Sequence, residues 1–315
     1  MELSSDQLRI GALAAIGNTP MVQLNRIVKP SGARVLLKLE TANPTGSMKD
    51  RMAVEVVQSA VRAGKLKPGG TVVEYTAGAT GISIAFVCAA LGYPFHVVFS
   101  DAFSDEKRRT MRAFGAQVTD EPSDHGRITE ELIKRMIARA DKISSEQPDH
   151  WWVDQLNNPD AERGYFSLGD EIWSQSGGRV NVFVMSVATA HAIHGVTHGL
   201  RKHNSNIRVV AVEPTESAVL SGHPTGSHRI EGIGIGFIPP LWNPKLVDEI
   251  QTVSTADAQQ MTRRLAREEG IFAGTSTGAN VTVALKVAAQ LPSDATVVTL
   301  AVDSGMRYLS TELYK

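Results

Sequence analysis

Lys49 is the residue whose surroundings best suit covalent chemistry. It follows the turn-forming run Asn43-Pro44-Thr45-Gly46, and Ser47 has a side chain suited to capping a helix, so we expect Lys49 in a first helical turn. The helix dipole disfavours a cation there, and partial burial lowers a lysine pKa further, toward a neutral amine that can form a Schiff base. A solvated, unreactive lysine is the alternative.

Two other segments combine small and hydroxyl residues with an expected strand-to-helix turn. The run Thr76-Ala77-Gly78-Ala79-Thr80-Gly81 offers free backbone N–H groups that can hold an anion, most naturally a carboxylate; a turn without a ligand is the alternative. The run Gly274-Thr275-Ser276-Thr277-Gly278-Ala279-Asn280 presents hydroxyls that either bind a ligand or cap the next helix. The glycine-rich stretch 232–236 is a weak match to a dinucleotide-binding loop, because no strand leads directly into it.

Three histidines share one face of an expected helix. His191, His194 and His198 are spaced i, i+3 and i+7, a pattern that can ligate a metal, but no Asp or Glu in the segment completes such a site. We therefore expect a solvent-exposed or interface face and no metal. Cys88 lies among Ala, Phe and Val, which predicts a packed, unreactive thiol, and a single cysteine fits a reducing compartment.

The elements that position these residues alternate along the chain. Short β-rich runs separated by amphipathic helical stretches predict right-handed βαβ units and parallel sheets, an α/β fold. The expected strands are Val35–Leu39, Thr71–Tyr75, Phe95–Phe99, Ala116–Asp120, Asn181–Met185, Ile207–Val212 and Thr296–Val302. The main expected helices are Asp50–Ala63, Gly81–Leu91, Arg127–Ile143, Pro159–Ser174 and Thr255–Glu268. Ligands of such sheets bind beyond the carboxyl ends of strands, where segments 43–51, 76–83, 186–195 and 274–280 fall.

Length and charge narrow the class of protein. A chain of 315 residues suits about two domains. With 32 basic and 33 acidic residues the net charge is −1, so we expect no nucleic-acid partner. No run of about 18 apolar residues occurs, so we expect no membrane span, and the start Met1–Asp6 is acidic where a signal peptide is basic. The expectation is a cytoplasmic protein.

Taken together, these segments resemble the cysteine synthase family (O-acetylserine sulfhydrylases), pyridoxal-phosphate enzymes of the tryptophan-synthase-β fold type. The resemblance covers nearly the whole chain. It rests on Ile16-Gly17-Asn18-Thr19-Pro20-Met21-Val22, the segment 43–51, Gln155-Leu156-Asn157-Asn158-Pro159, the segments 232–239 and 274–279, and the tail Asp303-Ser304-Gly305-Met306-Arg307-Tyr308-Leu309-Ser310-Thr311. It implies two domains, each an open, mostly parallel sheet flanked by helices, with a cofactor cleft between them.

The resemblance also implies roles for individual residues. Lys49 would hold pyridoxal 5′-phosphate covalently and later move the α-proton of the substrate. Ser276 would face the pyridine nitrogen, and a neutral partner there makes the ring a weaker electron sink, which favours prompt loss of a β-leaving group. The residues that would receive the carboxylate of the amino-acid substrate lie in one loop and one later position: Thr76, Ala77, Gly78, Thr80 and Gln155.

Two departures from the family pattern fall in the ligand loops. The family's substrate loop reads Thr-Ser-Gly-Asn-Thr-Gly, whereas this chain has Ala77 and Ala79; the missing Asn normally bonds the phenolic oxygen of the cofactor, a contact of about 1 kcal/mol. The phosphate cup reads Gly-Thr-Gly-Gly-Thr in the family and Ala188-Thr189-Ala190-His191-Ala192 here. Glycine lets backbone amides approach a phosphate closely and adopt positive φ. His191 either donates an N–H to the phosphate or fills its site.

The function predicted from the resemblance is β-replacement: acetate leaves O-acetylserine, and sulfide or a related nucleophile adds to give cysteine. A β-eliminating cysteine desulfhydrase and a catalytically weakened paralogue that acts as a binding or scaffold protein are the alternatives. We expect a homodimer. We also expect a smaller N-terminal domain of residues 1–12 and 35–146 and a larger one of 13–34 and 147–315, because the segment 144–149 is polar and contains proline.

Overall fold

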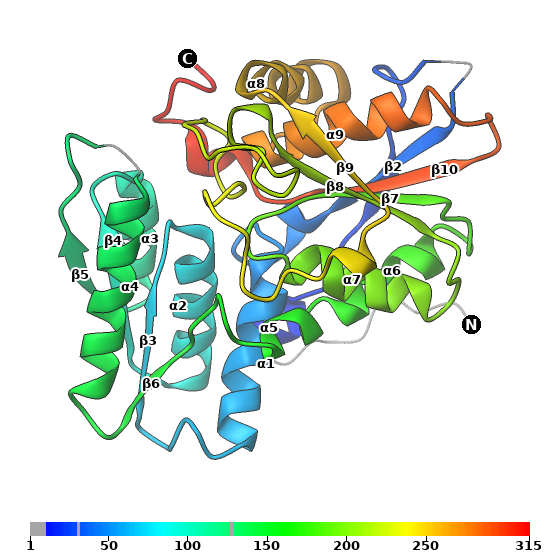
Figure 1. Ribbon diagram of the computed structural model, residues 1–315. Coiled ribbons are helices and arrows are strands. Elements are labelled where there is room, and N and C mark those ends of the chain that lie inside the picture. The colour runs from blue at the N-terminus through cyan, green and yellow to red at the C-terminus, as the bar shows by residue number, and fades with distance from the viewer. Residues whose placement is uncertain (1–10, 30–31, 127–128) are drawn as a thin grey trace.

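The chain folds around two sheets that lie in separate lobes (Figure 1). This computed structural model describes residues 11–29, 32–126 and 129–315; the first ten residues of the smaller predicted domain and the predicted helix start at 127 lie outside them. The six-stranded sheet has the order β1-β2-β10-β7-β8-β9, and the four-stranded sheet has the order β5-β4-β3-β6. Both are parallel except for the β1–β2 pair, which confirms the expected α/β architecture.

The strands and helices follow the predicted alternation closely. The strands are β1 (Met21–Gln23), β2 (Arg34–Leu39), β3 (Thr71–Tyr75), β4 (Phe95–Ser100), β5 (Gln117–Glu121), β6 (His150–Trp152), β7 (Val182–Ser186), β8 (Arg208–Pro214), β9 (Glu249–Val253) and β10 (Thr296–Ala301). The helices are α1 (Lys49–Arg62), α2 (Ala79–Leu91), α3 (Asp105–Ala113), α4 (Glu130–Ser145), α5 (Asp160–Arg163), α6 (Phe166–Gln175), α7 (His191–Arg201), α8 (Thr255–Arg264) and α9 (Thr275–Ala288). The short strands β1, β6 and β9 and helix α3 were not predicted.

Sheet pairing differs from the predicted domain boundaries at two strands. Strand β2 pairs with β10 in the six-stranded sheet, although residues 35–39 were assigned to the smaller domain. Strand β6 pairs with β3 in the four-stranded sheet, although residues 147–152 were assigned to the larger one. Both strands are short and pair with strands that are distant in sequence, so local polarity, such as that of the segment 144–149, carries no information about their pairing.

The two lobes share an apolar core. Alternate residues of β2 face opposite sides of its sheet, as strand geometry requires: Val35 and Leu37 pack under α9, and Leu36 faces the other side. That second side belongs to a cluster of buried side chains that runs from β10 and α7 through α1 to the four-stranded sheet. Helix α1 therefore lies between the lobes, and its first residue is Lys49 (Figure 1).

Candidate active site

The segment before α1 is anchored to the end of β10. Gly46 adopts a φ of 75°, and its N–H donates to the carbonyl of Asn43 at 2.7 Å, which is the predicted turn. The Met48 N–H donates to the carbonyl of Val302 at 3.0 Å, and the Ser47 hydroxyl accepts the Lys49 N–H at 3.2 Å. These contacts confirm that Lys49 opens a helix, and they place it beside the carboxyl end of a central strand.

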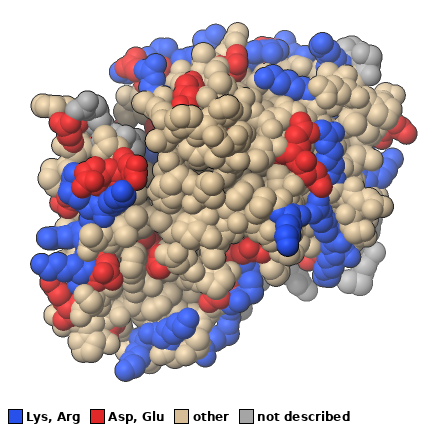
Figure 2. Space-filling model, in the orientation of Figure 1, with Lys and Arg blue, Asp and Glu red and all other residues tan. Residues whose placement is uncertain are grey.

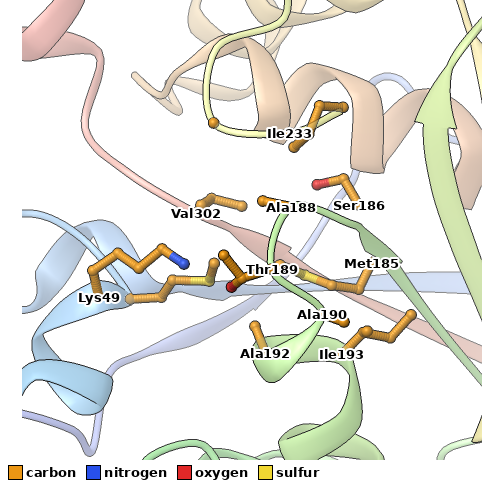
Figure 3. A pocket seen from close by; sticks show the side chains of 12 residues that line it. Lys49, Met185, Ser186, Ala188, Thr189, Ala190, Ala192, Ile193, Ile233 and Val302 are labelled. Carbon is orange, nitrogen blue, oxygen red and sulfur yellow. The ribbon is translucent and has the colours of Figure 1, made fainter. Parts of the chain in front are cut away.

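The Lys49 side chain points into a small pocket (Figure 3). Across the pocket lie the loop between β7 and α7, which contributes Ala188, Thr189 and Ala190, and the first turn of α7, which contributes Ala192. The remaining lining residues come from both sides of the loop and from two other segments: Met48, Met185, Ser186, Ile193, Gly232, Ile233 and Val302. The walls are mostly apolar, so the amine is the chemically distinctive group in the pocket.

Burial makes Lys49 a better nucleophile than an ordinary lysine. Desolvation lowers its pKa from 10.5 to about 8, and the nearby carboxylate of Asp303 opposes this shift without cancelling it. A substantial fraction of the amine is then neutral near pH 8, as Schiff-base formation requires. The predicted direction of the shift is confirmed, and burial is its largest cause.

The β7–α7 loop keeps a cup-like backbone although it lacks glycine. Ala190 has a φ of 70° and a ψ of −18°, and α7 begins at the next residue. Among the described residues the other non-glycine positions with positive φ are Asn18, His125 and Asp154, whose residue types tolerate it better than alanine. A β-carbon at this position therefore costs strain.

His191 does not fill the pocket. Its side chain is 2% exposed and is not among the lining residues; its Nδ1 lies 3.0 Å from the hydroxyl of Thr189. Burial, the charge of Lys49 and His194 lower its pKa to about 3, so the ring is neutral. Its Nε2 is buried and has no hydrogen-bond partner within the parts of the chain that the structure describes.

The expected histidine face is only partly correct. His194 is 1% exposed, so two of the three histidines are buried, and the expectation of a solvent-exposed face is wrong for them. Glu162, on the neighbouring helix α5, lies 3.1 Å from His198 and 3.7 Å from His194. This packing against α5 could not be read from the segment itself. Among residues 11–29, 32–126 and 129–315, no group of three or more metal-ligating side chains occurs.

The loop at the start of α2 is folded on itself. The Thr76 hydroxyl accepts the N–H groups of Gly78 at 2.9 Å and of Gly81 at 3.1 Å. Gly78 has a φ of 137°, and α2 begins at Ala79. The predicted strand-to-helix turn is therefore present, but its residues do not line the pocket that contains Lys49.

Gln155 lies beside that loop. Its side-chain N–H donates to the carbonyl of Tyr75 at 3.1 Å, and its backbone N–H donates to the carboxylate of Glu74 at 3.0 Å. Burial raises the pKa of Glu74 to about 8, although three N–H donors oppose the shift. The structure thus brings Gln155 to the end of β3, next to the loop of Thr76, Ala77, Gly78 and Thr80.

The hydroxyls at the start of α9 do not cap that helix. Thr275 accepts the backbone N–H of Glu231 at 3.0 Å, and Thr277 accepts that of Val302 at 3.0 Å. Ser276, between them, is 2% exposed. These contacts tie α9 to two segments that border the pocket, and they argue against simple capping.

Sequence reasoning missed three charged residues that lie near the loop at the start of α2. Glu74 interrupts an otherwise apolar strand, a signal that was readable in the sequence. Lys107, on the unpredicted helix α3, forms an ion pair with Glu231, and no local pattern points to either. Their pairing depends on how the two lobes meet.

The fold and the lysine pocket define a pyridoxal-phosphate-dependent enzyme, and the chain belongs to that family: the family model "Pyridoxal-phosphate dependent enzyme" matches residues 12–303. Within the family, the chain is 40% identical to cysteine synthase of Staphylococcus aureus over 301 residues, which is 95% of each chain.

Solved structures agree. Cysteine synthase of Entamoeba histolytica superposes with a TM-score of 0.92 at 35% identity, covering 100% of this chain and 93% of that one. O-acetylserine-dependent cystathionine β-synthase of Helicobacter pylori superposes with a TM-score of 0.91 at 33% identity, covering 98% and 100%. The resemblance predicted from sequence motifs is thereby confirmed, as are the fold class and the cofactor.

The residues present fit that cofactor. Lys49 supplies the amine, and the loop with the left-handed residue Ala190 lies across the pocket from it at the start of α7, a position where backbone N–H groups can bind an anion. The Ser186 hydroxyl, on the pocket wall, is buried without a hydrogen-bond partner among the described residues. A buried polar group of this kind calls for a polar occupant of the pocket.

Proposed function

We propose that this protein catalyses a pyridoxal-phosphate-dependent β-replacement on O-acetylserine or a similar activated serine, with sulfide or a related nucleophile as acceptor. The observation that carries the proposal is the desolvated amine of Lys49, with a pKa of about 8, facing the start of α7 across the pocket. Its support beyond the site is the 40% identity to cysteine synthase over 95% of the chain. When bound, pyridoxal phosphate supplies an electron sink for the α-carbon of the substrate.

In this proposal each loop has one task. Lys49 holds the cofactor and moves the α-proton, and Ser276 faces the ring nitrogen. The phosphate binds at the start of α7, and Ala79 lies where the family's asparagine contacts the ring. The residues of the proposed phosphate site are Ala188, Thr189, Ala190, His191 and Ala192. The substrate carboxylate binds at Thr76, Ala77, Gly78, Thr80 and Gln155.

The test uses the purified protein incubated with pyridoxal phosphate. Borohydride reduction followed by peptide mass spectrometry should find the pyridoxyl group on Lys49, and Lys49→Ala should lose it. The loaded protein should form cysteine from O-acetylserine and sulfide. A protein that takes up no cofactor, with Lys49→Ala indistinguishable from the wild type, would contradict the proposal and favour the scaffold function.

The same assay also shows which reaction and which acceptor the enzyme favours. One structural neighbour is described as a hydrogen sulfide-producing enzyme of Fusobacterium nucleatum, with a TM-score of 0.89 and 31% identity. Sulfide release from cysteine, faster than cysteine formation, would establish the desulfhydrase alternative. A second alternative, suggested by the Helicobacter pylori neighbour, is cystathionine β-synthase activity. The assay detects it when homocysteine is supplied as the acceptor.

We further propose a homodimer in the cytoplasm, with the chain divided into the two domains predicted above and the strands β2 and β6 exchanged between them. Figure 2 shows a broad region without charged side chains in the upper middle of the face in view, with charged groups on both sides of it, a surface compatible with a second copy. Cys88 is a buried free thiol, as in a reducing compartment. No helix in the described parts of the chain is long and apolar enough to cross a membrane.

A further inference from the structure

A partly buried ion pair joins the two lobes next to the proposed substrate loop. Lys107 lies on α3 beside the four-stranded sheet, and Glu231 lies in the loop whose next residues, Gly232 and Ile233, line the Lys49 pocket. The Lys107 ammonium donates to the Glu231 carboxylate. The lysine side chain is 5% exposed, whereas that of Glu231 is 33% exposed, so the cation is the more enclosed member of the pair.

Lys107 is also in contact with the substrate loop. A β-carbon added at Gly78 would collide with the aliphatic part of the Lys107 side chain. The ammonium lies 5.3 Å from the centre of the Tyr308 ring, whose hydroxyl donates to Asp303 at 2.6 Å. Packing on both sides therefore fixes the cation at the edge of the loop.

The loop itself has few donors to offer an anion. The Thr76 hydroxyl already occupies the N–H groups of Gly78 and Gly81, the Gln155 side chain donates to Tyr75, and alanine at 77 and 79 supplies no side-chain donor. The donors left in the loop, the Thr80 hydroxyl and backbone N–H groups, are all neutral, so a charged partner would strengthen the binding of a carboxylate there. Among the described contacts of the loop, that with Lys107 brings a charged donor to it. A hydrogen bond from a charged donor is stronger than one from a neutral donor.

We propose that Lys107 is a substrate-binding residue that receives the α-carboxylate of the amino-acid substrate, and that Glu231 competes with the substrate for the same ammonium. The inference rests on the proposed function, because it takes the loop 76–80 as the carboxylate site. Glu231 can withdraw because its carboxylate is partly exposed and its backbone N–H is held separately by Thr275.

The two members of the pair then affect binding in opposite directions. Lys107→Met should weaken binding of L-alanine to the cofactor-loaded protein, and raise KM for O-acetylserine, by about tenfold or more, whereas Lys107→Arg should keep most of the affinity. Glu231→Gln should tighten L-alanine binding and lower KM, because the competing carboxylate is gone. Binding of L-alaninamide, which has no carboxylate, should not change in any of these variants.

Glu249→Gln is the matched control. Glu249 pairs with Arg208 between β8 and β9, and its side chain is 32% exposed, close to the value for Glu231. The Glu249→Gln variant should bind L-alanine and L-alaninamide as the wild type does. If Lys107→Met and Glu231→Gln weaken L-alanine and L-alaninamide alike, the pair only ties the lobes together and the inference is overturned. Failure of the proposed function looks different: the wild-type protein then shows no visible absorbance from bound cofactor, which also removes the basis of the inference.

Discussion

Burial sets the pH at which the Lys49 amine becomes reactive. Because its pKa is lowered from 10.5 to about 8, half of the amine is neutral at about pH 8, and nearly all of it is neutral at a pH well below 10.5. We expect the rate of covalent cofactor attachment to the apoprotein to rise with pH and level off above about pH 9. Stopped-flow absorbance across the pH range measures this. A rate that still climbs in proportion to hydroxide at pH 10 would contradict it.

A second residue-scale prediction concerns Ala190 and its φ of 70°. Left-handed backbone costs a residue with a β-carbon about 1 kcal/mol that glycine avoids, so Ala190→Gly should raise the free energy of unfolding by about 0.5 to 1 kcal/mol. Urea denaturation provides the measurement. The control is Ala138→Gly on the exposed face of α4, where ordinary helical backbone predicts a loss of about 1 kcal/mol. Equal losses at both positions would show that Ala190 is unstrained.

At the scale of elements, α1 is held to α6 and β2 by a buried charge network. Arg51 donates to both Glu40 and Glu171, and Lys38 donates to Glu171 at 2.7 Å. Burial alone would raise the pKa of Glu171, but the hydrogen bonds and charges of Arg51 and Lys38 outweigh it and lower that pKa to about 2. The network holds the helix that begins with Lys49 in place.

Glu171→Gln should therefore destabilise the protein by about 3 kcal/mol at neutral pH, because buried Lys38 loses its carboxylate partner and Arg51 keeps only Glu40. The folded-state pKa lies below the usual 4.5, so the contribution is complete above that value and is lost as the pH falls toward 2. Urea denaturation at pH 7 and pH 3 should show the difference between variant and wild type shrinking. Glu268→Gln, in an exposed pair with Arg264, should change the stability little at either pH.

At the scale of the whole molecule, the proposed homodimer is tested by the mass of the protein in solution. One chain has a mass of 33.9 kDa, so sedimentation equilibrium should report twice that mass. A mass of one chain at micromolar concentration would contradict the homodimer.

Much of this molecule follows from local sequence. Apolar runs with β-branched residues form strands, Gly46 and the residues around it form a turn, and the helix that follows begins with Lys49, as expected. These features depend on steric and hydrogen-bonding preferences of a few neighbouring residues. The order of the motifs was also sufficient to identify the family.

Only the tertiary structure decided which segments distant in sequence come into contact. Whether β2 pairs with β10, whether His191 is buried away from the pocket, and whether Lys107 meets Glu231 across the lobes all depend on contacts between residues far apart in the chain. Burial, and with it the pKa of Lys49, is likewise a property of the packed molecule, because desolvation is imposed by surrounding atoms and not by sequence neighbours. The sequence alone determined which groups were present and on which elements, and folding determined their environment.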